Sequence, residues 1–174
     1  SLSKIRYSFG GQVKLPVVVK ALIGAGRGLG SAHSQSIEGI LMGIPGLKIV
    51  IPSTPYDARG LIKSAFRENN PVIFFEHTML RMGGPTSMIP EEDYAIPLGK
   101  AAIKRKGSDI TVVATALMVH RALSAAVELQ KKGISIEVID PRTLVPLDKL
   151  AIIDSVKKTG RLVIADSGWL TQGA

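Results

Sequence analysis

Short apolar segments alternate along this chain with stretches that carry one apolar face, the pattern of a parallel sheet covered by helices. The apolar segments are rich in valine and isoleucine and predict strands at 15–23, 47–51, 72–75, 110–114, 135–139 and 162–165. The stretches with one apolar face predict helices at 34–42, 54–68, 119–131 and 148–157. The predicted fold class is therefore α/β, with two units that each contain a parallel sheet.

The clearest helix start is the run Thr54-Pro55-Tyr56-Asp57. Thr54 can accept a hydrogen bond from a free backbone N–H, and Pro55 has no N–H to satisfy. Asp57 suits the positive end of the helix. The helix should end at Asn69-Asn70-Pro71, and its apolar face should carry Leu61, Ile62, Ala65 and Phe66.

Residues 83–99 lack this periodicity, because glycines and prolines there surround the acidic run Glu91-Glu92-Asp93. We interpret them as a linker between a first domain at 1–82 and a second at 100–174. Each predicted domain has too few elements to cover both faces of a sheet. We therefore expect the chain to be a fragment of a longer protein, shortened at both ends.

Composition narrows the class of protein. Of the 174 residues, 45% are hydrophobic and 21% are charged, which is typical of a globular protein. The sequence has neither a membrane-length apolar run nor the apolar core of a signal peptide at its start. Without cysteine, disulfides and thiolate metal sites are excluded. The net charge is +8, but the basic residues are scattered and aromatics are only 5%, so we expect no nucleic-acid partner.

A glycine-rich loop at 24–30 follows the first predicted strand. It matches neither the G-x-G-x-x-G dinucleotide motif nor a P-loop, so it indicates a turn that allows close backbone approach. His33 follows this loop, where open parallel sheets place their ligands. It could bind an anionic group or move a proton near neutral pH, although spacing alone favours a histidine satisfied by local contacts. The histidines have no H-x-x-x-H spacing, so zinc is not predicted.

Several longer segments, in order and spread over nearly the whole chain, carry a more specific signal. They are 4–7, 32–36 (Ala-His-Ser-Gln-Ser), 44–52 (Ile-Pro-Gly-Leu-Lys-Ile-Val-Ile-Pro), 57–65, 69–72, 96–99, 107–113 and 137–143 (Glu-Val-Ile-Asp-Pro-Arg-Thr). Together they resemble the beta subunit of thiamine-diphosphate-dependent 2-oxo acid dehydrogenases, whose members act on pyruvate, branched-chain 2-oxo acids or acetoin.

The resemblance implies an alpha2-beta2 heterotetramer of the transketolase-like superfamily. The alpha subunit would hold the cofactor's diphosphate and Mg²⁺, and the beta subunit its aminopyrimidine. Residues 1–82 would be the later part of the pyrimidine-binding domain, and 100–174 the start of the C-terminal domain. The expected partners are an alpha subunit, a second beta subunit and a lipoyl acyltransferase core, with no membrane partner. The expected location is the cytoplasm, or the mitochondrial matrix in a eukaryote.

The resemblance also implies two kinds of site residue. His33 corresponds to a histidine that lines the channel to the reactive carbon and assists acyl transfer to the lipoyl arm. A structural K⁺ site, built largely from backbone carbonyls, corresponds to Val17, Ala65, Phe66, Glu68 and Asn70. Hard cations bind oxygen ligands, and a helix carboxyl end offers free carbonyls.

One expected feature has no counterpart here. In the family, the beta-subunit glutamate that bonds the aminopyrimidine lies upstream of the first residue of this chain, so the cofactor-binding residues stay unknown. Two alternatives remain. One is another transketolase-like enzyme, such as a transketolase or a deoxyxylulose phosphate synthase, and the other is a non-catalytic assembly module.

Overall fold

The computed structural model describes residues 2–84 and 88–173, so residues 85–87 of the predicted linker lie outside the described residues. The first part contains η1 (Leu2–Lys4), α1 (Ile5–Ser8), β1 (Val18–Ile23), η2 (Ser31–His33), α2 (Glu38–Met42), β2 (Lys48–Val50), α3 (Pro55–Phe66), β3 (Val72–His77) and α4 (Thr78–Arg81). The second contains β4 (Ala102–Arg105), β5 (Ile110–Ala114), α5 (Ala116–Gln130), β6 (Ile136–Asp140), β7 (Thr143–Val145), α6 (Lys149–Thr159), β8 (Leu162–Ala165) and η3 (Leu170–Gln172).

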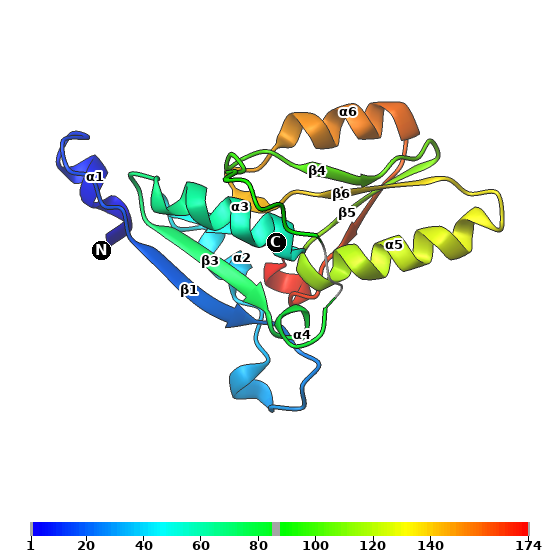
Figure 1. Cartoon of the computed structure of the whole chain (residues 1–174), viewed down its shortest axis with the longest axis horizontal. Helices are drawn as coiled ribbons and strands as arrows, with labels where there is room; N and C mark the ends of the chain where they lie inside the picture. Colours follow the sequence, from blue (N-terminus) through cyan, green and yellow to red (C-terminus); the bar gives the residue numbers. More distant parts are fainter. Residues whose placement is uncertain (1, 85–87, 174) are drawn as a thin grey trace.

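The described residues form two four-stranded sheets, which confirms the α/β class (Figure 1). The first sheet has the order β1-β3-β2-β7 and the second the order β4-β6-β5-β8. Both sheets are parallel except for one antiparallel edge strand each, β7 in the first and β4 in the second. The prediction of parallel sheets is therefore correct for the interior and wrong at these two edges.

The first sheet is packed on both faces. In β3, Phe74 faces a cluster with Leu61 and Ala65 of α3, whereas Phe75 joins a cluster on the other face that contains Ala116 of α5. Successive strand residues point to opposite faces, which explains this alternation. The first sheet therefore depends on a helix that begins in the second half of the chain.

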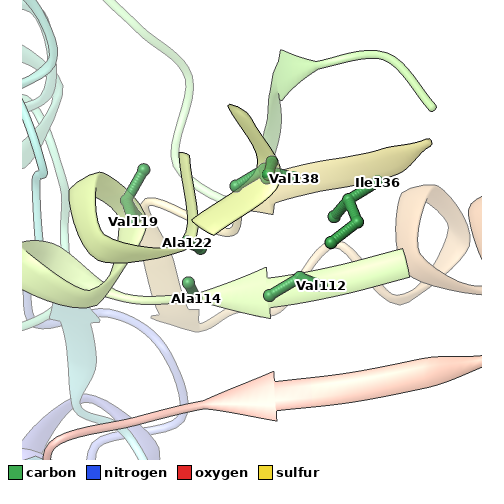
Figure 2. Packing of buried hydrophobic residues seen from close by; sticks show 7 residues of the cluster. Val112, Ala114, Val119, Ala122, Ile136 and Val138 are labelled. Atoms are coloured by element: carbon green, nitrogen blue, oxygen red, sulfur yellow. The ribbon is translucent and has the colours of Figure 1, made fainter. Parts of the chain in front are cut away.

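The second sheet is covered by α5 on one face and by α6 on the other (Figure 1). Figure 2 shows the apolar face, where Val112, Val138 and Ile136 cluster with Val119 and Ala122 of α5. The opposite face carries a buried polar cluster. There Thr111 lies 2.6 Å from Ser155 Oγ and 2.7 Å from Thr159 Oγ1, both on α6, and Ser155 also donates to Glu137.

Two predicted elements differ from the observed ones for tertiary reasons. β1 was expected to be a buried strand, but within the described residues it lies at the edge of its sheet, with Val19 and Leu22 exposed. The helix expected at 34–42 is confined to Glu38–Met42. The Gln35 carbonyl instead accepts a hydrogen bond from the Gly24 N–H, which draws the chain away from helical geometry.

The helix start at Thr54 is confirmed, because its side chain caps α3 by accepting from the Asp57 N–H at 3.1 Å. The predicted apolar face of α3 is wrong at one residue, Phe66. Phe66 is 65% exposed, whereas Ala65 is buried. One residue rotates the side chain about 100° around a helix, which turns Phe66 away from the sheet.

The described residues of the predicted linker are partly packed against α3. Tyr94 stacks on Tyr56 with ring centroids 4.6 Å apart, and Ile96 is buried beside Gly60. The Arg59 guanidinium donates to the Pro90 carbonyl and lies over the Tyr94 ring. This segment is therefore held against the first sheet's helix layer.

Candidate functional site

The carboxyl ends of β1 and β3 meet at one edge of the first sheet, because the parallel pairing sets Ile23 opposite His77. The glycine-rich loop follows β1 at this edge, where His77 ends β3 and Thr78 follows it. In open parallel sheets this is the edge at which ligands bind. It is therefore the candidate functional site.

His33 lies on η2 at this edge, with an exposed side chain. It lines a surface pocket of about 260 Å³, whose other lining residues include Arg27, Gln35, Ile37 and Thr78. An accessible imidazole beside a guanidinium can donate hydrogen bonds to an anionic or polarised oxygen. The position of His33 thus suits binding or proton transfer, although the structure by itself assigns no reaction to it.

Against Gly24, at the start of the glycine-rich loop, lies a buried histidine that sequence analysis did not single out. The His77 side chain is 2% exposed, and its Nδ1 accepts a hydrogen bond from the Met79 N–H at 3.2 Å. Burial lowers the pKa of His77, because removal from water disfavours the charged imidazolium. The neutral ring therefore serves as a fixed wall for the loop above it.

The five residues of the predicted potassium site lie at the other end of β1 and β3. The Val17 carbonyl accepts from the Val72 N–H at 2.9 Å, and the Ala65 carbonyl accepts from the Glu68 N–H at 3.2 Å. Phe66, Glu68 and Asn70 follow at the end of α3. These residues therefore lie near the amino end of β1, whereas His33 lies beyond its carboxyl end.

The Glu68 carboxylate is already engaged at this corner. It forms an ion pair with Lys48 and accepts the Asn69 N–H at 2.9 Å. Partial burial raises the pKa of Glu68, but Lys48 and the backbone N–H groups of Asn69 and Asn70 outweigh burial, so the net shift is downward. A cation bound here would therefore depend on backbone carbonyls, whose oxygens each carry two lone pairs.

A second polar cluster joins the two halves of the chain, and sequence analysis missed it. Asp57 and Asp140 are fully buried, and Lys104 forms ion pairs with both. Burial raises the pKa of Asp57. The hydrogen bonds from Lys104 and Thr54 and the charges of Lys104 and Arg142 outweigh burial, so the net shift of this pKa is downward. Burial dominates for Asp140, whose pKa is raised despite the nearby Lys104.

Neither a cluster of metal ligands nor a membrane span occurs among the described residues. No three His, Asp or Glu side chains gather there in a way that could hold a metal ion. None of the helices in that part of the chain combines the length and apolarity needed to cross a bilayer.

Comparison with known proteins adds the family context. Residues 2–82 match the model of the transketolase pyrimidine binding domain, and residues 99–174 match the model of the transketolase C-terminal domain. Together these matches span nearly all of the chain.

Similar proteins of known activity are beta subunits. The chain is 51% identical over 164 residues to the acetoin:2,6-dichlorophenolindophenol oxidoreductase subunit beta of Cupriavidus necator, covering 94% of this chain and 48% of that protein. It is 47% identical over 163 residues to the pyruvate dehydrogenase E1 component subunit beta of Bacillus subtilis, covering 94% and 50%. It is 50% identical over 165 residues to the 2-oxoisovalerate dehydrogenase subunit beta of the same organism, covering 93% and 49%. The chain therefore spans about half the length of the curated relatives it matches.

A solved structure shows the same fold. It is described as a split-gene transketolase in the form of an inactive beta4 tetramer, and it superposes with a TM-score of 0.79 at 26% identity. The superposition covers 92% of this chain and 51% of that one.

Proposed function

Because this chain belongs to the transketolase-like family, as part of a beta subunit of the thiamine-dependent 2-oxo acid dehydrogenase type, we propose that it contributes to oxidative decarboxylation of a 2-oxo acid or to cleavage of acetoin. In this proposal an alpha subunit supplies Mg²⁺ and the diphosphate contacts, and a lipoyl acyltransferase core receives the acyl group. The identity of 47–51% to three such beta subunits over more than nine-tenths of the chain carries the proposal.

Thiamine diphosphate, when bound, supplies the nucleophilic carbon that attacks the keto group. The described residues fit a role beside that chemistry. His33 borders an open pocket at the ligand edge of the first sheet, and Arg27 lines the same pocket. The aminopyrimidine contacts are not assigned to any residue of this chain.

His33 is proposed as the catalytic residue of this chain. Its exposed imidazole can donate a hydrogen bond to the acyl oxygen while the acyl group passes to a lipoyl sulfur, and general acid–base help of this kind is typically worth about 10²- to 10⁴-fold. Its exposure and its place at the pocket rim support this role. A histidine that only capped a helix would not need to face the pocket.

The experiment compares two rates in the alpha–beta assembly, with these residues carried by a beta subunit of the relatives' length. His33→Asn should lower reductive acylation of a lipoyl domain by about 10²-fold or more. It should change decarboxylation with an artificial electron acceptor much less. A ratio of the two rates equal to that of the parent would reject the catalytic role of His33, and absence of both activities in the parent would reject the proposed reaction.

We also propose that Val17, Ala65, Phe66, Glu68 and Asn70 form a structural K⁺ site. Their gathering at the carboxyl end of α3 supports this, because the end of a helix offers carbonyls with spare acceptor capacity and a partial negative charge. The ion would link the end of α3 to the start of β1.

A second candidate function is that of a non-catalytic assembly module, which binds another chain without turnover. Leu162, Val163 and Ile164 on β8 are 45–63% exposed, and within the described residues β8 is an unpaired sheet edge. Exposed apolar edges of this kind favour association with another chain. Capture of an alpha subunit without turnover would favour this candidate over the enzyme.

A further inference from the structure

Residues 24–35 form a loop that is closed at its base. The Gly24 N–H donates to the Gln35 carbonyl at 3.0 Å, so the two ends of the loop are tied together. His33 lies within the loop, two residues before Gln35. We call Gly24, Gln35, His77 and Thr78 the neck of this loop. The place of His33 is therefore set by how the neck is held.

The ring of His77 supports the neck from below. A Cβ added at Gly24 would lie 2.2 Å from His77 Nε2 and 2.4 Å from its Cδ2. Gly24 also has a φ of +89°, where side-chain-bearing residues are strained. The His77 ring thus fills the space that glycine leaves, and the bond from the Met79 N–H to Nδ1 fixes the ring's orientation.

Thr78 holds the other side of Gly24. Its Oγ1 donates to the Gly24 carbonyl at 3.2 Å, and the Thr78 side chain is buried. Thr78 also lines the pocket that His33 borders. Both backbone groups of Gly24 are therefore fixed, one by Gln35 and the other by Thr78.

The His33 side chain is exposed. Its position accordingly depends on the backbone of the loop and not on its side-chain neighbours. Displacement of a catalytic group by about 1 Å can lower a rate by as much as 10²-fold. Anything that loosens the neck should therefore act on the chemistry of His33.

We propose that His77 and Thr78 are positioning residues for His33, acting through the neck. The proposal rests on the proposed function for its effect on activity. Its structural part, the closure of the loop by the neck, can be measured independently of any reaction.

Thr78→Val tests the proposal, since it keeps the shape of the side chain and removes the hydroxyl. In the alpha–beta assembly, reductive acylation should fall by about 10- to 100-fold, with decarboxylation by artificial acceptor changed much less. Thr78→Ser, which keeps the hydroxyl, should restore reductive acylation. An equal fall in both rates would overturn the positioning role.

Trypsin cleavage after Arg27 provides the readout without activity, because Arg27 is the only Lys or Arg within residues 24–35. Loss of one buried hydrogen bond should raise the open population of the loop, and with it the cleavage rate, by roughly five- to tenfold in Thr78→Val. Thr159→Val is the matched control, since it removes a similarly buried hydroxyl from α6, which covers the second sheet. It should lower the melting temperature without raising cleavage at Arg27.

If Thr78→Val does not fold, His77→Asn replaces it, because Asn keeps an acceptor for the Met79 N–H but lacks the full ring beneath Gly24. If the folded variant, Thr78→Val or His77→Asn, is cleaved at Arg27 at the parent's rate, the proposal that the neck closes the loop is overturned. Faster cleavage with unchanged acylation, in an enzyme that His33→Asn does impair, would overturn the positioning role. If His33→Asn leaves the ratio of reductive acylation to decarboxylation unchanged, the proposed catalytic role of His33 fails. Faster cleavage at Arg27 in Thr78→Val would then still support closure of the loop by the neck.

Discussion

The Asp57 carboxylate lies 2.7 Å from the Arg142 guanidinium, and this ion pair ties the first turn of α3 to the segment between β6 and β7. Lys104 of β4 donates to the same carboxylate, whose side chain is fully buried. A buried carboxylate is tolerated only when it is paired and hydrogen-bonded. The stability of the junction between the two sheets therefore depends on the charges of Asp57, Lys104 and Arg142.

Asp57→Asn should destabilise the protein strongly. The substitution leaves Arg142 and Lys104 partly buried without their main counter-charge, and breaking a buried pair in this way usually costs about 3–5 kcal/mol. Urea denaturation of parent and variant measures the difference. Asp154→Asn is the control, because Asp154 and Lys157 form an exposed pair whose loss should change stability by less than about 0.5 kcal/mol. Equal effects of the two substitutions would contradict a special role for Asp57.

Glu137 should make stability depend on acid pH. Burial raises the pKa of Glu137, but the bonds from Lys158, Ser155 and the Gly107 N–H outweigh burial, so its net pKa is lowered. The unfolded chain then binds more protons than the folded one, so the contribution is complete above the unfolded pKa of about 4.3 and is lost as the pH falls through the lower folded value. The difference in unfolding free energy between parent and Glu137→Gln should shrink below about pH 4.3 and stay constant above about pH 6. A difference that grows on acidification would have the wrong sign.

Gly60→Ala should destabilise the protein although alanine favours helices. A Cβ at Gly60 would lie 2.6 Å from Ile96 Cγ1 and 2.8 Å from Tyr94 Cε2. Alanine gains about 1 kcal/mol in helix propensity, whereas overpacking costs about 1–3 kcal/mol, so the net effect should be a loss. Thermal unfolding measures it, with Gly43→Ala as the control, where the nearest atom would be 3.8 Å away. Ile96→Val should recover part of the loss in the double variant, and a more stable Gly60→Ala would show that Ile96 does not pack as described.

Potassium should raise the melting temperature more than sodium or lithium does at matched ionic strength. A ligand that binds only the folded state stabilises it, and the carbonyls at the end of α3 would select for ion size. Unfolding scans in the three chlorides provide the measurement. Melting temperatures that agree across the salts would count against the site at Val17, Ala65, Phe66, Glu68 and Asn70.

Local chemistry explains what the sequence could predict. Thr54-Pro55-Tyr56-Asp57 starts a helix by its own hydrogen bonding, so the cap on α3 could be identified without the rest of the molecule. The apolar runs of β3 and β5 likewise specify strands through their own side chains. The formation of such elements does not depend on which other helix or strand of the chain packs against them.

The parts that were missed depend on pairing at long range. β7 has three residues and becomes a strand only because β2 pairs with it, and β4 mixes Lys and Arg with Ala and Ile. The exposure of Val19 follows from the edge position of β1, which no local pattern encodes. His77 was missed because its role is one of shape, matched to the missing side chain of Gly24.

The path of the chain between the sheets restricts how it could be recombined. It leaves the first sheet after β3, builds β4, β5 and β6 of the second, returns to add β7 to the first, and goes back for β8. A gene fusion that transplanted residues 1–82 alone would carry a sheet with a bare edge at β2 and a buried Asp57 without Lys104 or Arg142. The two halves are therefore interlaced, and swapping modules between relatives would have to exchange β7 together with the strand it completes.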